Sequence, residues 1–373
     1  MEPFHRAALL VPTVKKRGIG GQGVRVAINA LFWGEETTGS GHYIRSLVQA
    51  LAEIDGENEY VLVMPRGLKH GRSFQGSVIP GRVKMLWRRT PFDGLSNNLT
   101  KLWFEQITFP NACRRARADL AFVAYVANTF FSPVPVVVTI HDLIPLILPA
   151  YRGSIWVQRY IRLVSSAARR MDLVLTDSVA SVRDIVRLLN IPSNRTRVIP
   201  LAAERAYRKV EEVDELARVR ALYDLPSRYL LYLGGFDVRK NVKQVLTAYA
   251  RARSVSGFPD DVWLVVAGKL PSEHIPFTPD PRVISATLGI TDRVLLTGWI
   301  EERDKPVIYS EAIAFLFPSY YEGFGLPPLE ALSCGVPVIT SDVSALPEVI
   351  GDAGLTVSPD DVDALMAAIF SVV

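Results

Sequence analysis

The 373-residue sequence has little cysteine and no long uninterrupted hydrophobic run. Its two cysteines, Cys113 and Cys334, lie far apart, so they have the spacing neither of a metal site nor of a disulfide framework. The longest apolar stretch, residues 133–150, is interrupted by His141, Asp142 and several prolines, whereas a membrane helix needs about 18 or more uncharged residues. We therefore expect a cytoplasmic protein without a membrane span.

The composition indicates a folded chain of two domains. Hydrophobic residues make up 49% of the sequence and charged residues 21%, the balance of a globular α/β protein, and the length exceeds what a single core usually holds. Charge is divided unevenly, because the first 200 residues hold 26 Lys and Arg against 14 Asp and Glu, and the remainder holds 16 against 24. Halves of about +12 and −8 predict an anionic partner for one of them: nucleic acid, a membrane surface or a phosphorylated substrate.

Short β-branched runs alternate with amphipathic stretches of helical length, which is typical of parallel α/β sheets. The first half has predicted strands at 24–30, 60–64, 83–87, 120–124, 134–140, 173–176 and 197–199, with helices near 41–54, 98–112, 153–170 and 178–190. The second half has strands at 229–233, 262–267, 294–296, 314–317 and 336–340, with helices near 240–253, 283–289, 302–310, 327–333 and 344–350.

This pattern predicts two doubly wound, Rossmann-like domains that face each other across a cleft, with ligands bound at the carboxyl ends of the strands. We expect a flexible basic tail over residues 1–23, an N-terminal domain over 24–205, a hinge with a short surface helix over 206–228 and a C-terminal domain over 229–373.

Two candidate sites follow strands of the first half. The loop with Gly39 and Gly41 opens a helix, where small residues let a phosphate approach the backbone amides, although an ordinary glycine turn explains it equally well. His141 stands where the strand 134–140 ends, so its imidazole is placed to hydrogen-bond a substrate hydroxyl or to orient a leaving group. The alternative is a structural histidine, with Asp142 bonding the following turn.

In the second half, Arg239 and Lys240 stand beside a helix start, after a glycine pair that permits close backbone approach. Cations at a helix N-terminus oppose the macrodipole unless an anion accompanies them, so a solvated basic helix start is disfavoured and a diphosphate site is favoured.

The most specific stretch places Glu322 and Glu330 around a glycine-rich turn. Carboxylates accept hydrogen bonds from sugar and ribose hydroxyls, and free amides at a turn suit phosphate or sugar oxygens. The turn between the two glutamates includes Gly323, Phe324, Gly325 and Leu326.

These motifs resemble glycosyltransferase family 4, the retaining nucleotide-sugar transferases of GT-B fold, and the similarity runs from about residue 24 to the end. They occur in the order seen in that family: the Gly39/Gly41 loop, Thr139-Ile-His141-Asp142-Leu-Ile-Pro145, Arg239-Lys240-Asn241 and Glu322-x7-Glu330. The sequence around His141 resembles that of bacterial mannosyl- and rhamnosyltransferases of polysaccharide assembly.

The resemblance implies transfer of a hexose, with mannose from GDP-mannose expected, from a nucleotide diphosphate sugar to a lipid-linked or polysaccharide acceptor of the cell envelope. It implies that Lys240, with Arg239 and the amides from Gly39 to Gly41, meets the diphosphate charge, and that Glu330 holds the ribose. Glu322 and the amides of Phe324 to Leu326 would hold the donor sugar, with His141 near the reacting carbon.

Three features of this sequence depart from the pattern of the family. Gly235 stands where many members carry an arginine, and the crossover helix that usually ends the family's chain is not expected before Val373. Asp361-Val-Asp363 resembles a metal motif of another transferase fold, but its place at a helix start indicates capping, so we expect no metal and no cofactor.

A non-catalytic nucleotide-sugar sensor or partner subunit is the main alternative. A nucleic-acid module is disfavoured because Arg114, Arg115 and Arg117 lack interleaved aromatics, and an NAD-dependent dehydrogenase is weaker still. The basic segment from Lys101 to Arg117, with Arg88 and Arg89, predicts peripheral contact with an anionic membrane.

Overall fold

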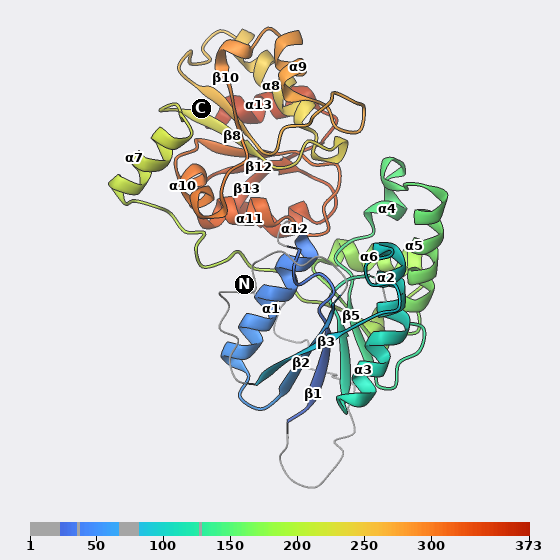
Figure 1. The fold of residues 1–373 in the computed structure, drawn as a ribbon. Helices are drawn as coiled ribbons and strands as arrows, with labels where there is room; N and C mark the ends of the chain where they lie inside the picture. Colours follow the sequence, from blue (N-terminus) through green and yellow to red (C-terminus); the bar gives the residue numbers. More distant parts are fainter. Residues whose placement is uncertain (1–22, 36–37, 67–81, 127–128) are drawn as a thin grey trace. The chain divides into compact units, whose positions relative to one another are not determined.

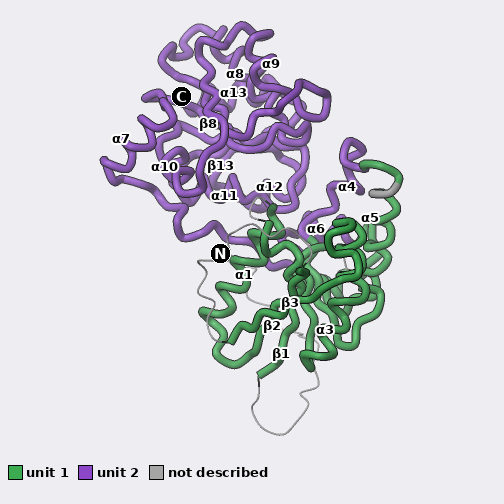
Figure 2. Tube along the Cα trace, in the orientation of Figure 1, with its two compact units in different colours: residues 1–140, 153–175, 186–197 green, residues 141–152, 176–185, 198–373 purple. Residues whose placement is uncertain are grey.

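The structure, a computed structural model, describes residues 23–35, 38–66, 82–126 and 129–373. Apart from Gly23, the predicted basic tail lies outside these residues. Contacts divide the chain into two compact units, the first of residues 1–140, 153–175 and 186–197, and the second of residues 141–152, 176–185 and 198–373 (Figure 2). The predicted domain boundaries stay a prediction.

The first sheet has seven strands in the order β3-β2-β1-β4-β5-β6-β7, with parallel pairing (Figure 1). The strands are β1 (Arg25–Asn29), β2 (Glu59–Pro65), β3 (Val83–Arg88), β4 (Leu120–Val123), β5 (Val136–Thr139), β6 (Leu173–Thr176) and β7 (Thr196–Val198). The helices are α1 (Gly39–Ile54), α2 (Asn97–Trp103), α3 (Phe109–Arg115), α4 (Ile144–Ile147), α5 (Ile155–Ala168) and α6 (Val179–Leu189).

The predicted helix over 98–112 is interrupted by a π-helical turn, Phe104–Thr108, between α2 and α3. Pro110 lies in the first turn of α3 and has no N–H, so it cannot donate the hydrogen bond that a continuous α-helix would require there. The π-helical turn just before it, which holds one extra residue per hydrogen-bonded turn, interrupts the α-helical hydrogen-bond pattern at this point. The π turn buries Glu105, whose carboxylate accepts hydrogen bonds from Tyr125 (3.2 Å) and Tyr160 (3.1 Å). Burial raises the pKa of Glu105 to about 7.

The second sheet has six strands in the order β10-β9-β8-β11-β12-β13, also parallel. The strands are β8 (Tyr229–Leu233), β9 (Trp263–Ala267), β10 (Val294–Gly298), β11 (Ala314–Phe317), β12 (Val338–Ser341) and β13 (Gly354–Val357). The helices are α7 (Val213–Leu222), α8 (Val242–Ser254), α9 (Pro281–Thr287), α10 (Lys305–Ser310), α11 (Leu326–Ser333), α12 (Leu346–Ile350) and α13 (Val362–Val372).

Strand β8 shows why the second-half strands read as continuous hydrophobic runs. Leu230 and Tyr232 pack into one core with α8, α9 and α13, and Leu231 and Leu233 pack into another with α10, α11 and α12. Figure 1 shows these two groups of helices on opposite faces of the sheet. Both faces are covered, as parallel sheets require.

The predicted fold class, two doubly wound parallel sheets, is confirmed. Strand β13 was not predicted, because its four residues are half-buried or exposed at the sheet edge and only Thr356 and Val357 are β-branched. Asp361 caps α13, as expected, by accepting a hydrogen bond from the amide of Ala364 (2.8 Å). Within the described segments, no helix is both long enough and apolar enough to cross a bilayer.

Candidate active site

Arg239 and Lys240 are held in the loop between β8 and α8. Both lie in a 3₁₀ turn, Val238–Lys240, which ends at Asn241 in the left-handed conformation (φ 58°). The buried amide of Asn241 donates hydrogen bonds to the carbonyls of Pro318 (3.0 Å) and Pro359 (2.8 Å). These bonds stabilise a conformation that side-chain-bearing residues rarely adopt, so the backbone of the cation pair is fixed.

Both cations reach the same carboxylate. Lys240 Nζ lies 2.7 Å from Glu322 Oε1, and Arg239 Nη1 lies 2.6 Å from Glu322 Oε2. The three side chains are 12–14% exposed, so these ion pairs are largely desolvated and stronger than pairs in water. Lys240 also lies over the ring of Phe317, 4.7 Å from its centroid.

The pKa shifts follow from this geometry. Burial alone would raise the pKa of Glu322, but the attraction of Lys240 and Arg239 outweighs it, so the pKa is lowered and the group is ionised. Burial lowers the pKa of Lys240, and repulsion by Arg239 adds to that effect. Arg239 is further balanced by Asp237 at 3.6 Å. The two buried cations thus pair with carboxylates of their own unit, Asp237 and Glu322. A phosphate group could compete with these carboxylates for the same N–H donors.

Gly323 needs to be a glycine because other backbone packs against it. A Cβ at this position would lie 2.4 Å from the carbonyl oxygen of His141 and 2.9 Å from the Cβ of Asp142. The carbonyl of Gly323 accepts hydrogen bonds from the hydroxyls of Ser178 (2.7 Å) and Ser181 (3.1 Å). The turn after Glu322 is therefore docked on the segments that follow β5 and β6, which belong to the same unit.

His141 is oriented by a residue that the sequence analysis missed. Its Nδ1 lies 2.7 Å from Oδ2 of Asp177, which is 3% exposed. A carboxylate accepts this hydrogen bond, so we assign the ring hydrogen to Nδ1. The pairing of β5 with β6 explains this contact, because Thr139 pairs with Leu175, and His141 and Asp177 each lie two residues beyond that pair. A correct prediction of the strand register would therefore have placed Asp177 beside His141.

Asp142 takes the structural role considered above for a residue in this position. Its Oδ1 accepts a hydrogen bond from the amide of Ile144 (3.0 Å), and burial raises its pKa. This bond is the one that the structural alternative predicted for Asp142, and the functional role of His141 stays a prediction.

Glu330 lies on α11 with partners of its own. Its carboxylate accepts a hydrogen bond from Tyr309 (3.3 Å), and burial raises its pKa to about 7 in spite of the attraction of Lys305. Among the described residues, no hydrogen bond or ion pair joins it to Glu322. The two glutamates of the motif therefore differ, since Glu322 is ionised by cations and Glu330 is a carboxyl that can change protonation near neutral pH.

Between them, the backbone offers unpaired donors. Gly325, at φ 126°, precedes the first turn of α11, a conformation that favours glycine. Within the part of the chain that the structure describes, the amides of Phe324, Gly325 and Leu326 donate no hydrogen bond. Amides at a helix start attract anions and sugar oxygens.

The Gly39/Gly41 loop lies in the first unit, at the start of α1. A Cβ at Gly41 would lie 2.1 Å from the carbonyl oxygen of Glu35, so close backbone packing requires this glycine, whereas Gly39 has open space. The hydroxyl of Thr38 already accepts the hydrogen bond of the Gly41 amide (3.2 Å). Donor binding by Gly39 and Gly41 stays a prediction.

Among the described residues, no group of three His, Cys, Asp or Glu side chains is arranged to hold a metal ion.

The second unit brings together five of the predicted site residues: Arg239, Lys240, Glu322, Gly323 and His141. The structure adds Asp177 to them. This arrangement of a parallel sheet with cations, amides and carboxylates at its strand ends is suited to a phosphorylated sugar.

Comparison with known proteins identifies the class. The chain matches the family described as Glycosyltransferase Family 4 over residues 37–205 and that described as Glycosyl transferases group 1 over residues 227–373. The O-antigen chain mannosyltransferase B of Escherichia coli is 30% identical over 360 residues, which cover 89% of this chain and 86% of that protein.

Solved structures share the fold. Sucrose-phosphate synthase from Thermosynechococcus elongatus superposes with a TM-score of 0.69 at 22% identity, covering 94% of this chain and 89% of that chain. Anabaena HepE, solved in complex with UDP, gives a TM-score of 0.66 at 16% identity, with the same coverage. These likenesses define a GT-B fold. The chain belongs to glycosyltransferase family 4 and is a glycosyltransferase.

Proposed function

We propose that this glycosyltransferase is a retaining mannosyltransferase, which transfers mannose from GDP-mannose to a lipid-linked or polysaccharide acceptor in cell-envelope glycan synthesis. The observation that carries the proposal is the desolvated pair Arg239 and Lys240 around Glu322, in a chain that is similar to an O-antigen mannosyltransferase.

The chemical task is to stabilise a departing diphosphate. The bond between the sugar C1 and the phosphate oxygen breaks, and the electron pair leaves with the nucleoside diphosphate. The acceptor oxygen bonds to C1, and the proton of its hydroxyl passes to the departing phosphate oxygen. In our proposal, Lys240 and Arg239 meet the developing negative charge without a metal ion. They are suited to this because their positions are fixed before the reaction, and preorganised donors in a dry site are the strongest electrostatic stabilisers.

The remaining residues hold the donor in place. We assign the sugar hydroxyls to Glu322 and to the amides of residues 324–326, and the ribose hydroxyls to Glu330. His141, oriented by Asp177, lies near the reacting carbon in this assignment, where its ring can hydrogen-bond a sugar hydroxyl. The unpaired amides and the buried carboxylates support these roles.

A thermal-shift titration with GDP and UDP, followed by turnover with GDP-mannose, tests the proposal. A ligand that binds only the folded protein raises its melting temperature by mass action, so we expect a shift with GDP and release of GDP from GDP-mannose when acceptor is present. A shift with UDP alone would contradict the choice of base. A shift with neither nucleotide, and no turnover, would contradict the donor site itself.

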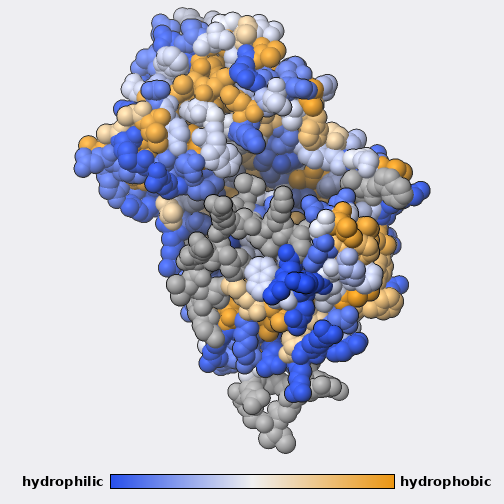
Figure 3. Space-filling view, viewed as in Figure 1, coloured by the Kyte–Doolittle hydropathy of each residue, from blue (hydrophilic) through white to orange (hydrophobic). Residues whose placement is uncertain are grey.

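We also propose that the first unit rests on an anionic membrane that carries the acceptor. An apolar stripe supports this: Leu99, Trp103 and Ile107 recur every four residues along α2 and the π turn and are 36–46% exposed. Leu95, in the turn before α2, is 79% exposed. Figure 3 shows hydrophobic residues gathered over α2, with hydrophilic residues beside them. Exposed arginines follow the stripe at Arg114, Arg115 and Arg117.

Vesicle flotation tests this placement. Each basic residue near an anionic surface contributes about 1 kcal/mol, so replacing Arg114, Arg115 and Arg117 with Gln is expected to weaken binding to vesicles with phosphatidylglycerol by about 100-fold. The control replaces three arginines of the second unit that are about half exposed or more, Arg251, Arg282 and Arg303. Equal binding by both variants would contradict the proposal.

A further inference from the structure

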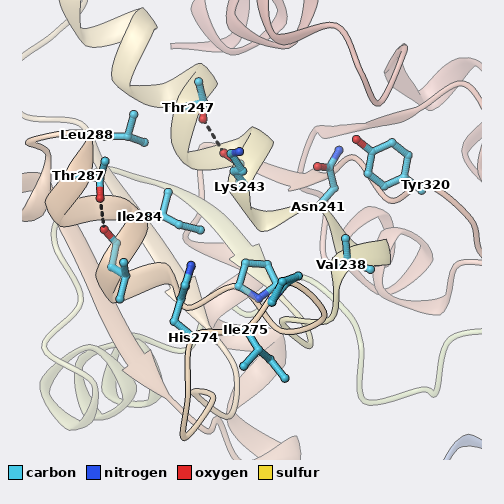
Figure 4. Close-up of a pocket in the computed structure, with 13 residues that line it drawn as sticks. Val238, Asn241, Lys243, Thr247, His274, Ile275, Ile284, Thr287, Leu288 and Tyr320 are labelled. Carbon is cyan, nitrogen blue, oxygen red and sulfur yellow. Dashed lines mark hydrogen bonds between the residues drawn. The ribbon is translucent and has the colours of Figure 1, made fainter. Parts of the chain in front are cut away.

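The second unit contains a cavity that the proposed reaction does not use. It has a volume of about 460 Å³, within the range of small-molecule sites, about 300–1,000 Å³. It lies between the start of α8, helix α9 and the loop before α9 (Figure 4). The lining residues that the argument uses are Val238, Lys243, His274, Val283, Ile284 and Tyr320.

The walls are largely apolar. Isoleucine, valine, leucine and proline side chains from α9 and the preceding loop face the space, and Ile275 and Val283 are 43% and 44% exposed at its mouth. Apolar surface left open to water costs free energy that a ligand of similar character recovers on binding. The body of a suitable ligand is therefore apolar.

Most polar groups of the lining already have partners. The hydroxyls of Thr247 and Thr287 donate to the carbonyls of Lys243 and Val283, both at 2.8 Å, within their own helices. The hydroxyl of Tyr320 donates to Asp360 at 2.8 Å. These groups stabilise the wall and contribute little to recognition.

Two donors remain. The ammonium group of Lys243 has no hydrogen bond or ion pair within the described part of the chain, and it lies in the first turn of α8, where no acidic residue balances it. His274 Nδ1 accepts the hydrogen bond of the Asp280 amide (2.9 Å), which leaves the ring hydrogen on Nε2. No acidic residue lines the cavity. A cation and a neutral hydrogen-bond donor beside an apolar wall favour a ligand whose polar group is a negatively charged hydrogen-bond acceptor.

We propose that this cavity binds an amphiphilic anion, a carboxylate or phosphate carried on an apolar chain, with the head group at Lys243 and His274 and the chain against Val283 and Ile284. The cavity borders the donor loop at Asn241 but has recognition groups of its own, because Lys240 is directed to Glu322 while Lys243, one turn later, lines the cavity. The inference goes beyond the proposed function and does not depend on it.

Fluorescence titration of the full chain with 11-(dansylamino)undecanoic acid tests the proposal. We expect saturable one-to-one binding that excess GDP does not displace. Val283→Trp fills the mouth and is expected to weaken binding at least tenfold, whereas the matched control, Val255→Trp, is not, since Val255 is 41% exposed and lies outside the cavity. Circular dichroism confirms that both variants are folded.

The head group is tested separately. Lys243→Gln is expected to weaken binding of the acid about fivefold and to leave binding of its methyl ester unchanged, because only the acid makes a charge-assisted hydrogen bond. Displacement by decanoate or by farnesyl phosphate shows which head group is preferred. Absence of saturable binding, displacement by GDP but by neither amphiphile, or equal affinity of Val283→Trp and Val255→Trp would overturn the proposal.

Discussion

The two halves of this chain have the same kind of sheet and opposite surface chemistry. The first half carries a net charge of about +12, with its arginines 114, 115 and 117 exposed, and the second carries about −8. Yet the second half buries Arg239 and Lys240 around a single glutamate. Net charge therefore indicates which surface attracts an anion from a distance, whereas local burial indicates where a specific anion binds.

Removing the buried lysine tests the local side of this comparison. Lys240→Ala is expected to lower kcat/KM for GDP-mannose by about 100-fold or more, because loss of one preorganised donor to a developing charge typically costs that much. The control is Lys209→Ala, which removes an exposed lysine of the same half. Values for the two variants within a factor of two would contradict the role of Lys240.

Close packing around the site is tested by comparing a glycine of the second half with an exposed glycine of the first. Gly323→Ala is expected to lower the free energy of unfolding by about 2 kcal/mol and to reduce turnover, because its Cβ would overlap the carbonyl of His141. In the first half, Gly56 has open space around a Cβ, so Gly56→Ala is expected to have little effect. Urea denaturation compares them, and equal midpoints would show that the turn can move.

The orienting role of Asp177 predicts a smaller effect. Asp177→Asn keeps the size of the side chain but removes the charge that favours the His141 tautomer, so we expect kcat to fall about tenfold with little change in KM. The pH profile of kcat is expected to shift in the variant, which a purely structural role would not cause. An unchanged profile together with an unchanged kcat would contradict the assignment.

Each half buries one carboxyl whose pKa is raised to about 7, Glu105 in the first and Glu330 in the second. Because the folded protein keeps these protons at pH values where the unfolded chain has lost them, the free energy of unfolding falls as pH rises from about 5 to 7. The slope is about 1 kcal/mol per pH unit for each group.

Glu105→Gln and Glu330→Gln are each expected to flatten this dependence, as measured by urea midpoints at several pH values. Only Glu330→Gln should also weaken GDP binding. Weakened binding in both variants would contradict the separate roles of the two halves.

Much of the fold followed from the sequence because buried parallel strands leave a strong signal. The run Tyr229 to Leu233 is apolar at every position since both faces of β8 are covered. The π turn before Pro110 and the exposed edge strand β13 left no comparable signal, because each depends on local geometry and not on periodicity.

The residues of the candidate site that stand in short sequence motifs were predictable from the sequence. Glu322, Gly323 and the cation pair come from two motifs, and the structure brings them into contact. Asp177 was missed because its relation to His141 exists only through the pairing of β5 with β6. The cavity at Lys243 was missed for a similar reason, since its walls come from α8, α9 and the loop between β9 and α9, which come together only in the folded chain.

The central claim is that the cation pair of the second half, Arg239 and Lys240, holds the nucleotide diphosphate. Hydrogen exchange of the full chain, measured by mass spectrometry with and without GDP, tests it most directly. We predict slower exchange in the segments around Arg239 and Lys240 and from Glu322 to Glu330, with no change from residue 97 to 117. Protection confined to residues 97–117, with none around Lys240, would contradict the account.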